Sequence, residues 1–192
     1  MPGPKRERVR RLILKKTAVL CARHGIERVT MDQIAREAQL TRTAVYYYFP
    51  SKEAVLQALW RLGWRMLYHA IEPYESMVED DPMTALTHAI EREYELFRRR
   101  RALLKTLFRM SAHRDTAIFR HPDADRDRRR YLEFHRRVLE IGIHKGVFRP
   151  VDIGVALRAI HGIIIGFLTF PISDDRRIDS ELIIEVVRRF LA

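Results

Sequence analysis

Residues 30–55 read TMDQIAREAQLTRTAVYYYFPSKEAV, and this stretch predicts two short helices joined by a tight turn. The Thr30 hydroxyl can accept a backbone hydrogen bond at the start of the first helix, and Gln33 completes a capping box. That helix should stop near Gln39, and Thr41 should cap the second helix. Two short helices separated by a turn of three or four residues are typical of a helix-turn-helix motif.

The positive charge of the chain is concentrated around this motif. The 192 residues include 36 Lys and Arg against 25 Asp and Glu, a formal net charge of +11. Residues 1–70 hold 14 of the basic residues and only five of the acidic ones. A basic segment joined to a nearly neutral one indicates that the first part meets a polyanion, either nucleic acid or an anionic membrane surface.

Composition and periodicity favour an all-α protein. Hydrophobic residues make up 47% of the chain, Gly and Pro are few at eight each, and no stretch alternates with the period of a strand. The single cysteine, Cys21, excludes a disulfide framework and fits a reducing cytoplasm. The most apolar stretch, Val155–Pro171, is shorter than the about 20 residues of a membrane-spanning helix and contains an arginine. We expect a cytoplasmic protein that does not enter a membrane.

Helical spacing predicts about nine helices, with an N-terminal helix-turn-helix domain over residues 1–52 and a larger helical domain over residues 53–192. The expected helices cover approximately residues 8–23, 30–39, 41–49, 52–68, 82–97, 102–110, 123–145, 152–171 and 180–191. The helix over residues 153–170 is apolar on nearly every side, so it must be covered on every side. A second subunit could cover it together with the last helix; a purely monomeric core is the alternative.

The opening segment strongly resembles the DNA-binding module of the TetR family of bacterial transcriptional regulators. The resemblance covers about residues 9–60 and implies the all-α fold with its helix-turn-helix. The matching features are Thr30, Ile34-Ala35, Ala38, Leu40-Thr41, Val45-Tyr46, Tyr48-Phe49 and Ser51-Lys52-Glu53. Cys21 and Lys16 depart from the family's usual residues, and Gln39 stands where the turn usually has Gly. A residue other than Gly is strained at positive φ, so the geometry of this turn stays open.

The second short helix has the size that the DNA major groove accepts, with residues near its start placed to reach base edges. Arg42 can pair with guanine O6 and N7, and Thr43 offers a hydroxyl and a methyl group, so we expect these two to read sequence. Phosphate contacts are expected from hydroxyl groups, helix N-termini and one ammonium group. The residues expected to make these phosphate contacts are Thr30, Thr41, Tyr46, Tyr47 and Lys52.

Several of these side chains have a second interpretation. Tyr48 should pack in the core and Tyr47 should project outward. Tyr46 could pack in the core or project outward. The basic residues before the first predicted turn could form an arm toward phosphate or the minor groove, or a solvated tail. They are Lys5, Arg6, Arg8, Arg10 and Arg11.

The resemblance also implies a homodimer through the last two helices, which reads a palindromic operator on double-stranded DNA. In the family a small molecule that binds among the middle helices changes the distance between the two DNA-binding domains of the dimer. The resemblance therefore implies a repressor that an effector releases from DNA. Candidate pocket residues are aromatic: Trp60, Trp64, Tyr94, Phe97, Phe108, Tyr131, Phe134 and Phe167. Core packing is the alternative for each, and also the favoured interpretation of His135 and His161.

The arginine runs Arg98–Arg101 and Arg128–Arg130 have two interpretations. They are solvated helix ends, or one of them meets an anionic effector such as the phosphates of an acyl-CoA; other lipophilic ligands are equally open.

Enzymatic motifs are absent from the sequence. No serine lies in G-x-S-x-G, and there is no Walker loop, no G-x-G-x-x-G and no zinc-binding histidine pair. Asp123-x-Asp125-x-Asp127 begins like a calcium loop, but Arg128 and Phe134 stand where Gly and Glu are needed. We expect no enzyme, no cofactor and no metal. One alternative function remains open: a basic helical protein that docks on a membrane or a protein partner through its first helix.

Overall fold

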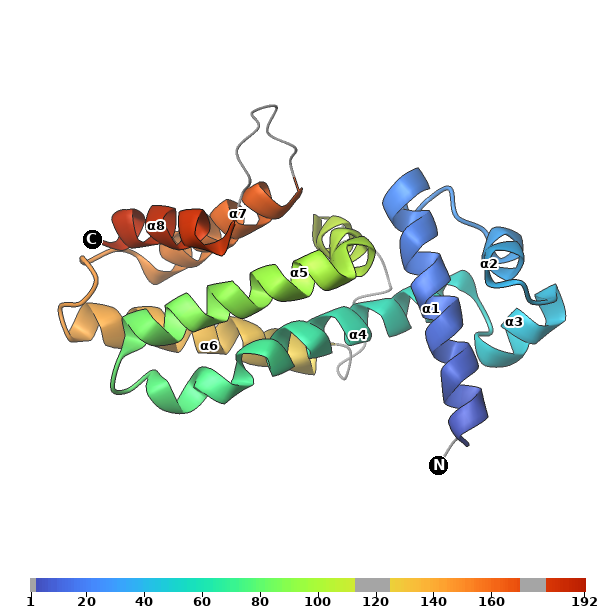
Figure 1. The fold of residues 1–192 in the computed structure, drawn as a ribbon, viewed down its shortest axis with the longest axis horizontal. Helices are drawn as coiled ribbons and strands as arrows, with labels where there is room; N and C mark the ends of the chain where they lie inside the picture. Colours follow the sequence, from blue (N-terminus) through green and yellow to red (C-terminus); the bar gives the residue numbers. More distant parts are fainter. Residues whose placement is uncertain (1–2, 113–124, 170–178) are drawn as a thin grey trace. The chain divides into compact units, whose positions relative to one another are not determined.

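The computed structural model describes residues 3–112, 125–169 and 179–192, and within these ranges every regular element is a helix (Figure 1). The expected all-α class is confirmed. The elements are α1 (Pro4–His24), α2 (Met31–Ala38), α3 (Arg42–Tyr48), α4 (Lys52–Ile71), the 3-10 helix η1 (Glu72–Met77), α5 (Pro82–Ala112), α6 (Arg126–His144), α7 (Ile153–Thr169) and α8 (Ser180–Leu191). No helix in the described ranges is long and apolar enough to cross a membrane.

Two predicted boundaries differ from the structure. The helices expected over 82–97 and 102–110 are both part of α5, and the expected break is a single non-helical residue, Arg100, with φ −130° and ψ 32°. The first helix begins at Pro4 rather than near Arg8, because Pro is favoured at the first helical position and Gly3 precedes it in an extended conformation. The expected start at Asp123 of the helix over 123–145 and the expected end at Pro171 of the helix over 152–171 lie outside the described residues.

The chain divides into two compact units. The first contains Met1–Trp64 and Arg100–Arg126, and the second contains Arg65–Arg99 and Asp127–Ala192. Each unit therefore includes segments distant in the sequence, and both α4 and α5 contribute residues to both units. The sequence-based boundary at residue 52 stays a prediction.

The core of the first unit is the buried face of α1. Ile13, Thr17 and Cys21 are fully buried on this face, and α1 packs on α2, which packs on α3 (Figure 1). Burial raises the pKa of the Cys21 thiol to about 11, so it stays protonated and unreactive. Arg109 of α5 donates to the carbonyl oxygens of Cys21 and Ala22, both at 3.2 Å. The Cys21 carbonyl also accepts from the N–H of Gly25 at 3.0 Å, so the guanidinium adds a second bond at the end of α1.

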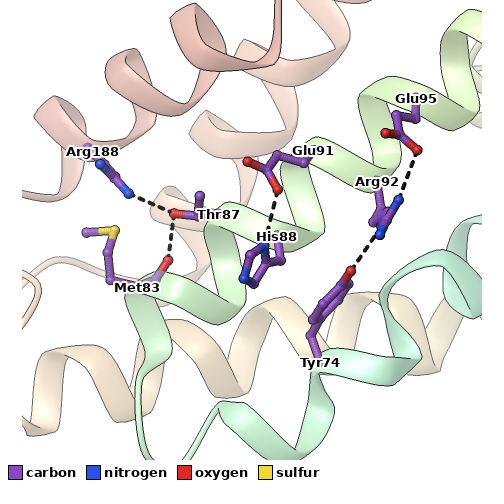
Figure 2. A network of polar contacts seen from close by, with 8 residues as sticks. All are labelled: Tyr74, Met83, Thr87, His88, Glu91, Arg92, Glu95 and Arg188. Atoms are coloured by element: carbon purple, nitrogen blue, oxygen red, sulfur yellow. Dashed lines mark hydrogen bonds and ion pairs between the residues drawn. The ribbon is translucent and has the colours of Figure 1, made fainter.

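The second unit is held by apolar packing and by polar contacts between α5 and α8. Figure 2 shows Arg188 of α8 donating to the Thr87 hydroxyl at 3.2 Å, while Thr87 donates to the Met83 carbonyl at 2.9 Å. One turn further along α5, Arg92 donates to the Tyr74 hydroxyl of η1 at 3.0 Å. The α7 and α8 helices lie side by side (Figure 1). The Arg188–Thr87 bond joins α8 to α5, and the Arg92–Tyr74 bond joins α5 to η1.

The turn between α2 and α3 has a defined geometry despite its missing glycine. Gln39 adopts the left-handed conformation, with φ 55° and ψ 43°. Its N–H donates to the Arg36 carbonyl at 3.1 Å, and the N–H of Leu40 donates to the Ala35 carbonyl at 2.9 Å. These two bonds make a Schellman motif, which ends α2 and redirects the chain into α3.

We expect Gln39→Gly to stabilise the protein by about 1 kcal/mol, because glycine adopts the left-handed conformation without a steric penalty. Urea denaturation followed by circular dichroism measures the change. Arg36→Gly is the matched control and should destabilise, since Arg36 is helical. Equal destabilisation by both substitutions would contradict the strain assigned to Gln39.

Candidate DNA-binding surface

The orientation of α3 follows from its cap and its buried side. The Thr41 hydroxyl accepts from the N–H of Ala44 at 3.1 Å, which fixes the start of the helix. Val45 is fully buried and Phe49, just after the helix, is 2% exposed. Since these two residues face inward, the opposite side of this seven-residue helix faces solvent.

Arg10 of α1 holds the other end of α3. Its Nη1 donates to the Tyr48 carbonyl at 2.8 Å, and its guanidinium carbon lies 4.3 Å from the centre of the Phe49 ring. This combines a charge-assisted hydrogen bond with a cation–π contact. Residues 5–11 are helical, so the expected solvated tail is wrong, while their contact with phosphate or the minor groove stays a prediction. The sequence gives no signal for a contact between residues 38 positions apart.

Arg42 lies at the start of α3 with its guanidinium already engaged. Its Nε lies 3.2 Å from Oδ1 of Asp32, and its Nη1 donates to Oδ2 at 3.4 Å. A hydrogen bond with Tyr46, and then the charge of Asp32, raise the pKa of Arg42. The carboxylate presents two acceptors to the guanidinium, as guanine does through O6 and N7. Asp32, which the sequence did not reveal, thus orients the Arg42 guanidinium at the start of α3. On binding DNA, Arg42 would release the Asp32 carboxylate and pair with a base instead.

The other expected reading and phosphate-binding residues of α3 are accessible. Thr43 is exposed, Tyr46 is 39% exposed and Tyr47 is 68% exposed. Tyr48 is half-buried and meets the Tyr47 ring edge-on at 5.2 Å. The guanidinium of Arg6 lies 5.7 Å from the Tyr47 ring. Exposed hydroxyl and guanidinium groups therefore gather around the outer side of α3.

The three remaining expected phosphate contacts also have structural roles. Thr30 accepts from the N–H of Gln33 at 3.3 Å and completes the predicted capping box, while Thr41 caps α3. Both hydroxyl groups retain a proton for donation to phosphate. Lys52, the first residue of α4, donates from Nζ to the Glu27 carbonyl at 3.0 Å. Its ammonium group thereby braces the loop before α2.

The aromatic residues expected to line an effector pocket do not all lie in one unit. Trp60, Trp64 and Phe108 belong to the first unit, where the two indole rings meet edge-on at 5.5 Å. The others belong to the second unit, with three of them buried and two half-buried: Phe97, Tyr131 and Phe134, then Tyr94 and Phe167. From the first arginine run, the Arg98 guanidinium lies 6.0 Å from the Tyr94 ring.

Part of the first unit matches a known family. Residues 13–59 match the bacterial regulatory proteins of the tetR family. The A-factor receptor protein of Streptomyces griseus is 25% identical over 170 residues, which cover 88% of this chain. The chain spans 57% of the length of that relative.

Solved structures share the whole fold. The TetR family transcriptional regulator PfmR from Thermus thermophilus has a TM-score of 0.73 and 26% identity, with 93% of each chain covered. AibR in complex with isovaleryl coenzyme A and operator DNA has a TM-score of 0.75 and 22% identity. This second match covers 95% of this chain and 97% of AibR. At that identity the likeness to AibR is one of fold.

Arg42→Ala should weaken binding to the preferred DNA site about tenfold to a hundredfold and relax base preference at one position in each half-site. Fluorescence anisotropy with single-base variants of the site measures both effects. Lys52→Ala is the matched control: it should weaken all sequences equally and lower the slope of log affinity against log salt by about one unit. Unchanged base preference in Arg42→Ala would remove Arg42 from the reading residues.

Proposed function

The chain belongs to the tetR family of bacterial regulatory proteins, and on that premise we propose that it is a ligand-responsive repressor. It acts in the cytoplasm as a homodimer that binds a palindromic operator and is released by a small-molecule effector. The observation that carries this proposal is the outer side of α3. Arg42, Thr43, Tyr46 and Tyr47 are exposed there, while Val45 and Phe49 anchor the helix from within.

The proposed dimer interface is the uncovered side of α7, together with α8. Positions 155, 159, 162 and 166 fall within about 60° of one another at 100° per residue, so they form one stripe along α7. Val155 is 50% exposed on this stripe. A Cβ added to Gly162 or to Gly166 would meet nothing within 4 Å. An apolar stripe with room beside it suits close packing of a partner helix.

A dimer is also needed for specificity. One short recognition helix contacts only a few base pairs, which is too few to select one site in a genome. Two copies related by a two-fold axis would read two half-sites about one helical turn apart, so the operator would be palindromic.

The proposed effector is a lipophilic molecule or an acyl-CoA. AibR shares the fold, and its complex contains isovaleryl coenzyme A. In this chain the second unit provides buried aromatic residues for an apolar group. It also holds the exposed Arg98 beside Tyr94, and Arg130 with its guanidinium 5.2 Å from the Tyr68 ring. These cations are available to an anionic portion of the effector.

Selection of bound duplexes from a randomised pool tests the proposed function. We expect an inverted repeat, and the operator in the genome should then lie beside the gene that the protein regulates. Binding without any sequence preference, with affinity set by salt alone, would contradict a repressor that reads an operator.

Val155→Arg should convert the dimer to a monomer and weaken operator binding at least tenfold, because it places a charge in the proposed apolar interface. Sedimentation velocity measures the oligomeric state, and anisotropy measures operator affinity. Val147→Arg is the matched control, since Val147 is 43% exposed but lies between α6 and α7. A dimer that persists in Val155→Arg with unchanged stability would place the interface elsewhere.

A further inference from the structure

Four polar side chains lie together inside the second unit. Glu93 of α5 is 2% exposed and His135 of α6 is 1% exposed. The His135 ring centre lies 4.6 Å from that of Tyr131 and 5.0 Å from that of His161, a half-buried residue of α7. The sequence predicts that both histidines are satisfied core residues, and this is wrong for Nε2 of His161.

Each imidazole uses one nitrogen to bind the backbone of its own helix. Nδ1 of His135 lies 2.9 Å from the Tyr131 carbonyl oxygen, and His161 makes the equivalent bond to the Leu157 carbonyl. Nδ1 therefore carries the proton in each ring. Among the described residues, Nε2 of His161 is buried without a hydrogen-bond partner, whereas Nε2 of His135 and Oε1 of Glu93 are buried and face each other at 3.3 Å. A buried polar atom without a partner is rare and costly, so Nε2 of His161 requires an explanation.

His161 presents an acceptor. Burial lowers the pKa of His161 to about 3, with the neighbouring His135 as the second cause. The ring is therefore neutral at physiological pH. Because its proton is on Nδ1, its Nε2 carries a lone pair and can only accept a hydrogen bond.

The Glu93 carboxyl group contacts two other members of the cluster. Oε1 of Glu93 lies 3.3 Å from Nε2 of His135, and the Tyr131 hydroxyl hydrogen-bonds to the same carboxyl group. Burial raises the pKa of Tyr131 well above its usual value, so the phenol keeps its proton. A charged molecule entering here would lose its hydration, and Arg128 is the cation whose charge acts on His161.

A metal ion and a carboxylate are both disfavoured as occupants of this cluster. In the described part of the chain, no group of three or more His, Cys, Asp and Glu side chains is arranged to hold a metal ion. A carboxylate would meet the Glu93 oxygen and the lone pair of His161, which are both acceptors. A molecule that donates a hydrogen bond and carries no charge there would satisfy the cluster.

We propose, on the premise of the proposed function, that Glu93, Tyr131, His135 and His161 form the polar end of the effector site and bind an uncharged hydrogen-bond donor of an otherwise apolar molecule. The donor is a hydroxyl or an amide N–H. Phe134 meets His135 edge-on at 5.3 Å and is buried, which provides an apolar neighbour. A coenzyme A thioester meets this requirement through the hydroxyl and amide groups of its pantetheine arm, whereas a free fatty acid does not.

Matched probes test the donor requirement on the DNA-free, full-length protein. Isothermal titration compares octanol, decanol and dodecanol with their methyl ethers and with the carboxylates of the same chain lengths. We expect the best alcohol to bind at least about tenfold more tightly than its ether, and the carboxylate to bind most weakly. Equal affinities, a preference for ether or carboxylate, or no binding by any alcohol would overturn the proposal.

His161→Phe tests the cluster itself. It removes the acceptor and keeps an aromatic ring, so the Tm should stay unchanged or rise by about 2–4 °C. The alcohol and its ether should then bind with about equal affinity. Glu93→Gln should also reduce this preference. His88→Phe is the matched control, because His88 stacks on Tyr74 outside the cluster and should keep the preference. A His161→Phe variant that keeps the preference, or whose Tm falls by more than about 4 °C, would show a purely structural role.

The two proposals can fail separately. If the probes show the donor preference but no DNA sequence is selected, the effector site stands and the repressor function fails. If an operator is selected but the donor preference is absent, the repressor function stands and the assigned effector chemistry fails.

Discussion

A seven-residue helix is not stable alone in water, so everything that α3 presents to solvent depends on what holds its inner side. Val45 and Phe49 supply the apolar contact, and the Thr41 hydroxyl fixes the first turn. Arg10 of α1 then fixes the last turn through the Tyr48 carbonyl. Because both ends and the inner side are held, the outward side chains have a defined direction. This constraint makes a short, exposed helix usable as a reading element.

The long helix α5 carries residues of both units, and its one non-helical residue, Arg100, lies at their boundary. On one side of Arg100, Glu93 belongs to the buried polar cluster. On the other side, Thr106 donates to the Ala18 carbonyl at 3.1 Å and Arg109 binds the end of α1. The same helix therefore connects the proposed effector site with the helix that anchors α3.

Local features could be predicted from the sequence, whereas contacts between distant residues could not. The caps at Thr30 and Thr41 follow from residue types only three positions apart, and both are present. The contact of Arg10 with Tyr48 and the pairing of Glu93 with His135 depend on how helices pack. Periodicity treats each helix separately, so it marks His135 as a core residue without revealing its buried partner. The geometry at Gln39 was equally hidden, because its strain is balanced by hydrogen bonds rather than avoided by a glycine.

The central claim is that α3 enters the major groove of DNA, and methylation interference on a selected operator tests it most directly. Dimethyl sulfate methylates guanine at N7 in the major groove and adenine at N3 in the minor groove. The account predicts that N7 methylation at one or more guanines, placed symmetrically in the two half-sites, blocks binding, and that Arg42→Ala loses this sensitivity. Interference from adenine N3 alone, or from no base at all, would contradict it.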